Sequence, residues 1–129
     1  MSRLTARVAS GVLAGGAAAA IALVGAGAAN AAAPFSQGLV PTATVCSPSQ
    51  YAAFQVRGDG WATVDGAKFK LVRNGGVVAN TATRVNNYAI ELRTSYGTFP
   101  GPGYYSLCAT NTGTHNTLAT VQIRTDNEF

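Results

Sequence analysis

The chain has few of the side chains that carry acid–base chemistry. Among 129 residues there are two cysteines, five carboxylates and one histidine, His115. A catalytic triad needs a base that an acid orients, but His115 stands in a turn rich in threonine, glycine and asparagine with no acid beside it. The sequence also contains no P-loop, GxGxxG, HExxH or GxSxG motif. We therefore expect His115 to be a solvent-exposed turn residue rather than a catalytic base.

The carboxylates are too scattered to indicate a hydrolase or a metal site. Asp59 and Asp65 each adjoin a glycine, which is typical of turns. Asp126 and Glu128 lie at a C-terminus that we expect to fray, so few carboxylates are left for paired acid chemistry. A calcium site would need more oxygen ligands than the stretch from 59 to 65 supplies. We predict no catalytic residue, no metal site and no cofactor.

Charge is sparse too, since Asp, Glu, Lys and Arg make up 11% of the chain and the net charge is +4. Arg3 and Arg7 belong to the N-terminal segment, and beyond them seven basic residues face five acidic ones, a net charge of +2. These basic residues are spread along the chain, whereas nucleic-acid binding usually needs a dense basic stripe. We therefore expect no nucleic-acid partner.

The N-terminus has the order of an export signal. Residues 1–7 form a short basic start, and residues 8–29 are apolar without a charge. Ala29-Asn-Ala31 fits the small-x-small pattern of signal peptidases, and cleavage there would begin the mature chain at Ala32. A retained membrane helix is the alternative, because more than 18 apolar residues can span a bilayer. The segment is mostly alanine and glycine with no stop-transfer charges, so we expect bacterial secretion and no membrane attachment after cleavage. The predicted segments are a signal peptide at 1–31 and one domain at 32–129.

Cys46 and Cys108 are expected to form one disulfide. An exported chain lies in an oxidising compartment, and a small core benefits from a cross-link. The bond would close a loop of about 60 residues and contribute roughly 4 kcal/mol in the chain-entropy model. A zinc site or a nucleophilic thiol pair is the alternative, but there is no CxxC spacing and only one histidine.

Beyond residue 32 the pattern is that of a sandwich or barrel. Short runs of β-branched and aromatic residues are separated, about every 8 to 12 residues, by glycine, proline, asparagine or aspartate. No helical period is sustained, so we expect no helix outside the signal. The expected strands cover residues 42–46, 51–57, 61–64, the two arms of a hairpin at 69–79, 88–93, 104–110 and 118–124.

The hairpin is the clearest local signal. Asn74-Gly75 can occupy the two positive-φ positions of a type I′ turn. In that register Phe69 and Leu71 share a face with Val78, and the two lysines of the first arm point to the other side.

Two further stretches have a readable pattern. Residues 88–93 alternate, which places Tyr88, Ile90 and Leu92 inward and Glu91 outward. The prolines and glycines of residues 99–103 predict a tight connection into the next strand.

The order Cys46, Trp61, Cys108, with Gly103-Tyr-Tyr-Ser-Leu-Cys108 at its end, resembles an immunoglobulin-like domain. In that family the two cysteines bridge two sheets beside a core tryptophan, which would be Trp61. The resemblance implies an all-β fold, a single antiparallel β-sandwich of about seven strands. The family's corner tyrosine stands two residues before the second cysteine, where this chain has Ser106 and carries its tyrosines at 104 and 105.

Binding needs only a surface, and exposed aromatic rings could stack on sugars or anchor a protein partner. The alternative is that most of these rings fill a small core. The candidate binding surface comprises Trp61, Tyr96, Phe99, Tyr104 and Tyr105. We expect a secreted, monomeric, non-enzymatic protein that binds an extracellular protein, cell wall or carbohydrate. The alternatives are a protease inhibitor presenting residues 99–103 or 58–61, and a small extracellular hydrolase.

Overall fold

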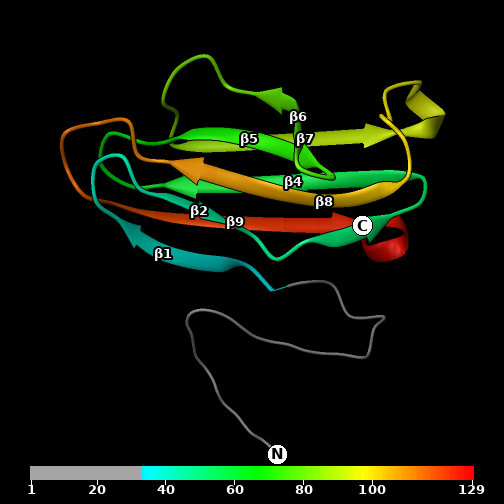
Figure 1. Cartoon of the computed structure of the whole chain (residues 1–129), viewed down its shortest axis with the longest axis horizontal. Coiled ribbons are helices and arrows are strands. Elements are labelled where there is room, and N and C mark those ends of the chain that lie inside the picture. The colour runs from blue at the N-terminus through cyan, green and yellow to red at the C-terminus, as the bar shows by residue number, and fades with distance from the viewer. Residues whose placement is uncertain (1–32) are drawn as a thin grey trace, which may run out of the picture. The chain divides into compact units, whose positions relative to one another are not determined.

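The computed structural model describes residues 33–129, which form two antiparallel β-sheets (Figure 1). The first sheet, in the order β1-β9-β4-β7, is built from β1 (Phe35–Leu39), β9 (Thr117–Thr125), β4 (Gln55–Ala62) and β7 (Asn87–Arg93). The second is built from β2 (Thr44–Cys46), β8 (Gly103–Thr110), β5 (Lys68–Arg73) and β6 (Gly76–Asn80), with β3 (Gln50–Ala52) also paired to β8. The predicted signal peptide, residues 1–31, and its cleavage site lie outside the described residues.

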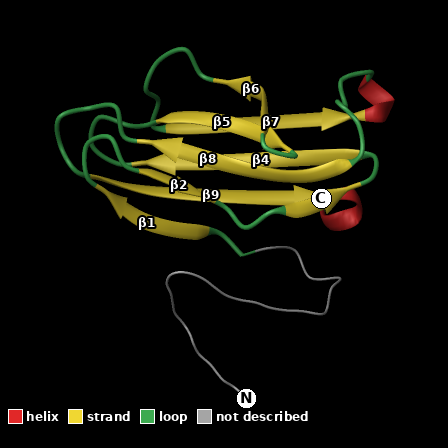
Figure 2. Ribbon diagram, in the orientation of Figure 1, coloured by secondary structure: helices red, strands yellow, loops and turns green. Residues whose placement is uncertain are grey.

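An all-β fold with two antiparallel sheets is confirmed, although residues 33–129 hold nine strands rather than about seven. The strands expected at 88–93, 104–110 and 118–124 are β7, β8 and β9, each within one residue of the expected bounds. Two short 3-10 helices, η2 (Thr94–Tyr96) and η3 (Asp126–Glu128), follow β7 and β9 at the same end of the first sheet (Figure 2). Within residues 33–129, no helix is long and apolar enough to cross a membrane.

The predicted turn between β5 and β6 is confirmed, but the predicted orientation of one hairpin side chain, Val78, is wrong. Asn74 and Gly75 both have positive φ, 49° and 87°, as a type I′ turn requires. A β-bulge then shifts the register, so that Ala79 rather than Val78 lies opposite Leu71. Ala79 packs against the core and Val78 is exposed, which overturns its predicted place on the buried face.

Residues 58–61, read from the sequence as a turn, instead lie inside β4, the strand that pairs with both β7 and β9. Gly60 faces the core, and a Cβ there would lie 2.4 Å from Cε1 of Phe69. The Phe69 ring, from the second sheet, stacks on Tyr88 of the first with 5.7 Å between ring centroids. The glycine is therefore required because an aromatic ring occupies the space of its side chain.

The core fills the space between the two sheets. Its largest fully buried side chains include Tyr105, Phe69, Leu39, Leu71, Leu107, Ile123, Val56 and Val121. Tyr88, Ile90 and Leu92 pack against this cluster, as the alternation in β7 predicts. Tyr105 packs beside Phe99, and its Oη donates a hydrogen bond of 2.6 Å to the carbonyl oxygen of Gly101.

The disulfide between Cys46 and Cys108 is confirmed, with a different placement from the one that the resemblance implies. The two cysteines lie directly opposite each other on β2 and β8, with their Cα atoms 4.0 Å apart. The bond therefore joins neighbouring strands of one sheet and does not bridge the two sheets. Trp61 is 44% exposed on the outer face of the first sheet, so its expected place in the core is also wrong.

Candidate functional site

The five aromatic residues of the expected binding surface do not form one surface. Trp61 and Tyr96, 44% and 62% exposed, belong to opposite ends of the first sheet's outer face. Tyr104, 59% exposed, lies on the outer face of the second sheet, where its ring meets Tyr51 edge to face. Phe99 packs against the core and Tyr105 is fully buried, so Tyr105 cannot contribute to a surface.

The outer face of the first sheet carries a connected set of charged and polar side chains. Alternate residues of a strand point to the same side, so the outward positions of three adjacent strands form one surface. We call this surface the network face, and it comprises Gln55, Arg57, Asp59 and Trp61 of β4, Glu91 and Arg93 of β7, and Arg124 of β9.

Asp59 is the centre of the network and is only 7% exposed. Arg57 donates to both of its carboxylate oxygens, from Nε at 3.0 Å and from Nη2 at 2.9 Å. Arg124, on the neighbouring strand, donates from Nη2 to Oδ2 at 2.9 Å. Two arginines therefore hold one carboxylate in a fixed orientation, with the paired donors of Arg57 adding directional specificity.

Glu91 forms the second junction. Its Oε1 accepts a hydrogen bond of 2.9 Å from Nη1 of Arg57, and its Oε2 accepts one from Nε of Arg93. These contacts, that from Arg93 first, lower the pKa of the Glu91 carboxyl. The hydrogen bond to Asp59 is in turn the largest cause that raises the pKa of Arg57. Both groups are charged at neutral pH, so the network is ionic.

One end of the network face is bordered by aromatic rings. The guanidinium carbon of Arg93 lies 5.5 Å from the centroid of the Tyr96 ring and 4.9 Å from that of Phe129. Its Nη1 also donates to Oε1 of Gln55 at 2.8 Å. Arg93 is thereby fixed on both sides, and Tyr96 is its neighbour rather than a free ring.

The other end of the network face is more open. Trp61 is flanked across the sheet by Asn87 and Thr120, and the next outward position on β7 is Ala89. The indole nitrogen of Trp61 has no hydrogen-bond partner within residues 33–129. The ring is therefore partly accessible beside the charged network.

The C-terminal carboxylates have structural roles. Asp126 accepts hydrogen bonds of 2.9 Å from the backbone N–H groups of Ala53 and Phe54, and Glu128 accepts one of 2.8 Å from that of Thr125. The Asp126 bonds tie η3 to the turn between β3 and β4, and the Glu128 bond caps η3 itself. The expectation of a frayed terminus is therefore wrong for these residues.

His115 is exposed, as predicted, but it has a partner that the sequence did not reveal. Its Nδ1 lies 2.9 Å from Oδ2 of Asp65, and this hydrogen bond is the main cause that lowers the pKa of Asp65, with Arg84 contributing less. No hydroxyl or thiol of residues 33–129 hydrogen-bonds to the imidazole, so no nucleophile is paired with it there. That part of the chain also holds no group of three His, Cys, Asp or Glu side chains arranged as metal ligands.

Of the two segments predicted as loops that could inhibit a protease, only one is a loop in the structure. Residues 58–61 lie within β4 and form no loop, so that alternative is wrong. Residues 99–103 do form a connection, which Arg73 holds by donating from Nη2 to the carbonyl oxygen of Pro102 at 2.8 Å and from Nε to that of Gly101 at 3.2 Å. The second loop is therefore well fixed, although its Phe99 points to the core.

A scan against protein-family models finds no match to this chain, and a search of the curated proteins finds none either. The fold and the site define a disulfide-linked, two-sheet β-domain whose outer faces differ in their chemistry. The network face is not predicted from the sequence, because Asp59 is expected there in a turn. The alternation of Gln55, Arg57 and Asp59 is the signal that could have revealed it.

Proposed function

We propose that the mature domain is a secreted, non-enzymatic module that binds an extracellular glycan on its network face. The observation that carries the proposal is the half-exposed Trp61 ring beside a row of planar, ion-paired side chains on the outer face of one sheet. A sugar ring has an apolar C–H face and a rim of hydroxyl groups. This surface offers a complementary group for each of those two parts.

Trp61 supplies the apolar part of the proposed contact. Aromatic rings bury a large area at a small cost in rotamer entropy, and an accessible indole can stack against the C–H face of a sugar. The indole N–H is a donor that a sugar hydroxyl can accept. A single ring of this kind, with polar neighbours, suits a carbohydrate better than an apolar protein surface.

The charged side chains supply the polar part. A guanidinium carries five N–H donors, and Arg57 uses three of them on Asp59 and Glu91. Its remaining donors and the unused lone pairs of the carboxylates can meet hydroxyl groups, which both donate and accept. Because the ion pairs already fix these side chains, binding costs less conformational entropy than it would for free ones.

The layout favours a chain of sugars over a single unit. Outward positions on a strand recur about every 7 Å, so Trp61 and Arg57 lie about 13 Å apart along β4. A ligand that contacts both must extend along the strand. We therefore expect an oligosaccharide or polysaccharide ligand.

Affinity electrophoresis of the mature protein through soluble polysaccharides, followed by calorimetry on those that retard it, tests the proposal. Trp61→Ala should weaken binding at least tenfold, whereas Trp61→Phe should recover part of it. Tyr104→Ala is the matched control, because that ring is also exposed but lies on the other sheet. Equal affinity of Trp61→Ala and wild type, or no retardation by any polysaccharide, would overturn the proposal. Hydrolysis of a bound glycan, lost on His115→Ala, would overturn its non-enzymatic part.

A protease inhibitor is the second candidate, favoured by the rigid hold of Arg73 on residues 99–103. A preorganised loop binds a protease cleft at low entropic cost. Titration against serine proteases and metalloproteases separates the two candidates. Stoichiometric inhibition, lost when the loop is replaced by glycine and serine, supports the inhibitor, and no inhibition at large excess eliminates it.

Export, cleavage after Ala31 and a monomeric state are parts of the same proposal. The disulfide supports the export, because such bonds persist in oxidising compartments. Relation to immunoglobulin-like domains is a proposal supported by the two sheets and by the Tyr105 hydrogen bond to Gly101, which resembles the family's tyrosine corner. Intact mass of the protein from culture medium, with and without reductant, tests the export, the cleavage and the disulfide together.

A further inference from the structure

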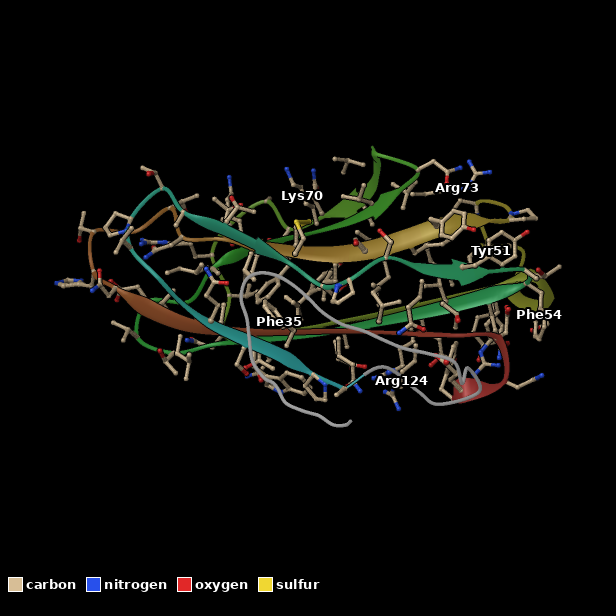
Figure 3. The ribbon with its side chains drawn as sticks, turned by 60° about the horizontal axis from the view of Figure 1, so that its bottom comes forward. Phe35, Tyr51, Phe54, Lys70, Arg73 and Arg124 are labelled. Carbon is tan, nitrogen blue, oxygen red and sulfur yellow. A yellow bond between two sulfur atoms is a disulfide. The ribbon has the colours of Figure 1, made fainter. Side chains whose placement is uncertain are left out.

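The outer face of the second sheet contains a hollow of about 230 Å³ that the proposed glycan site does not use. It is lined by Lys68, Phe69, Lys70, Asn80, Thr81, Thr110 and Thr112. The hollow arises because β6 ends at Asn80, so the first residues of β5 lack a neighbouring strand on that side. Lys70 and Arg124 project from opposite sides of the sandwich, so the hollow and the network face are separate surfaces (Figure 3).

The two lysines of this hollow are the only lysines in the chain, and both are exposed. No carboxylate lines the hollow, and neither lysine has an ion pair in the part of the chain that the structure describes. The arginines of that part differ. Three of them, Arg57, Arg93 and Arg124, pair with carboxylates. Arg73 donates to backbone carbonyls, and the charge of Arg84 helps to lower the pKa of Asp65.

All five carboxylates have other partners. Asp59 and Glu91 hold the network face, and Asp65 pairs with His115. Asp126 accepts backbone N–H groups of the turn between β3 and β4, and Glu128 accepts that of Thr125. No acidic side chain is therefore left to neutralise the lysines. Two lysines whose Cα atoms lie about 7 Å apart along one strand produce an uncompensated positive potential over the hollow.

The base of the hollow is fixed. Lys68 and Lys70 lie in register with Thr110 and Cys108 of β8, and Cys108 carries the disulfide to β2. The hydroxyl of Thr110 lies 2.8 Å from that of Thr44, and the hydroxyl of Thr81 accepts the backbone N–H of Phe69. The hydroxyls of Thr81 and Thr110 are therefore held in place beside β5 and its two lysines.

We propose that this hollow is a binding site for a phosphate group. Lysine ammonium groups bind phosphate as point charges, and hydroxyl and amide donors around them can reach the several oxygens of a tetrahedral oxyanion. The phosphate is either free or part of a phosphodiester polymer, and both sources present the same oxygens. The site is independent of glycan binding, because it uses the opposite sheet and none of the network residues.

Titration of ¹⁵N-labelled mature protein with inorganic phosphate at constant ionic strength tests the site, with sodium acetate as the reference anion. We expect saturable amide shifts at residues 68–70, 80–81 and 110–112 with phosphate and much weaker shifts with acetate. Lys68→Gln/Lys70→Gln should weaken phosphate binding at least tenfold. Lys68→Arg/Lys70→Arg should stay within about threefold of wild type.

Shifts of equal size with both anions, or an unchanged affinity of the double glutamine variant, would overturn the site. A glycerol-phosphate polymer that competes with inorganic phosphate at a lower phosphate concentration assigns a chain-borne ligand, whereas no competition assigns the free anion. Polysaccharide binding of the double glutamine variant should equal that of wild type. That measurement separates failure of the phosphate site from failure of the glycan proposal.

Discussion

The two outer faces of the domain differ in how their charges are used. On the first sheet, three arginines pair with two carboxylates in a connected network that keeps a net charge of +1. On the second, two lysines stand without acidic partners beside a covalent cross-link. Both sheets bury one apolar face, so the packing of the core does not require this difference.

The comparison indicates what each arrangement provides. Paired charges fix the direction of hydrogen-bonding groups and leave a smaller net charge than two unpaired lysines do, which suits a neutral ligand rich in hydroxyls. Unpaired charges keep flexible side chains and a net potential, which suits an anion. The two sheets also depend on different stabilising interactions, with ion pairs on one outer face and a disulfide on the other. Four changes test this division.

Removal of the disulfide should have the largest effect. Cys46→Ala/Cys108→Ala frees a loop of 62 residues, and the chain-entropy model gives a loss of about 4 kcal/mol in the free energy of unfolding. Urea denaturation followed by tryptophan fluorescence measures the loss. A loss below about 1 kcal/mol would show that the second sheet does not depend on its cross-link.

Gly60→Ala should have the second-largest effect on stability, because its methyl group would collide with the Phe69 ring. Overpacking of this kind costs about 1 to 3 kcal/mol. Gly38→Ala on β1 is the matched control, since a Cβ there meets nothing within 4 Å, and we expect it to be nearly neutral. Thermal unfolding of both variants measures the difference. Equal midpoints would contradict the close packing of β4 against the second sheet.

Gly60 also shows where prediction from the sequence fails. Residues 88–93 alternate between apolar and polar side chains, so their strand and its inward face could be read directly. Gly58-Asp-Gly60 has the composition of a turn but lies in an inner strand of the first sheet, where the Phe69 ring of β5, on the other sheet, occupies the space that a side chain at Gly60 would fill. A contact between residues nine apart and on different sheets leaves no local signal.

The candidate site, like the fold, could be predicted only in part from the sequence. The exposure of Trp61 and Tyr104 agrees with a role at a surface, but Tyr105, adjacent to Tyr104, is buried because alternate residues of β8 face opposite sides. The pairing of Arg57, Glu91 and Arg124 depends on which strands are neighbours. Strand order comes from the tertiary fold, and no local pattern in this chain specifies it.

Asp59→Asn should have an intermediate effect, because it leaves Arg57 and Arg124 without their shared carboxylate. Breaking a largely buried ion pair on one side is destabilising, and since both arginines are partly exposed we expect a loss of about 2 kcal/mol. Lys70→Gln on the other sheet should change stability by less than about 0.5 kcal/mol. Urea denaturation of the two variants gives the comparison, and equal losses would contradict the division between paired and unpaired charges.

The smallest effect concerns the pH dependence of the network. Arg93 and Arg57 lower the pKa of Glu91 in the folded protein, so the folded state binds the Glu91 proton more weakly than the unfolded state does. The resulting stabilisation is fully present above the ordinary glutamate pKa of about 4.3 and is lost as the pH falls through the lowered folded value. Glu91→Gln removes this contribution at every pH.

The difference in urea midpoint between wild type and Glu91→Gln should therefore be largest at pH 6 to 7 and should shrink below about pH 4.3. Asp65→Asn is the reference variant. Its carboxyl also has a lowered pKa, owing mainly to His115, but this pair is solvent-exposed and lies outside the network, so we expect a smaller difference over the same range. A difference for Glu91→Gln that stays constant from pH 7 to pH 3 would mean that the carboxylate acts through packing alone. In that case the ionic character assigned to the network face would fail.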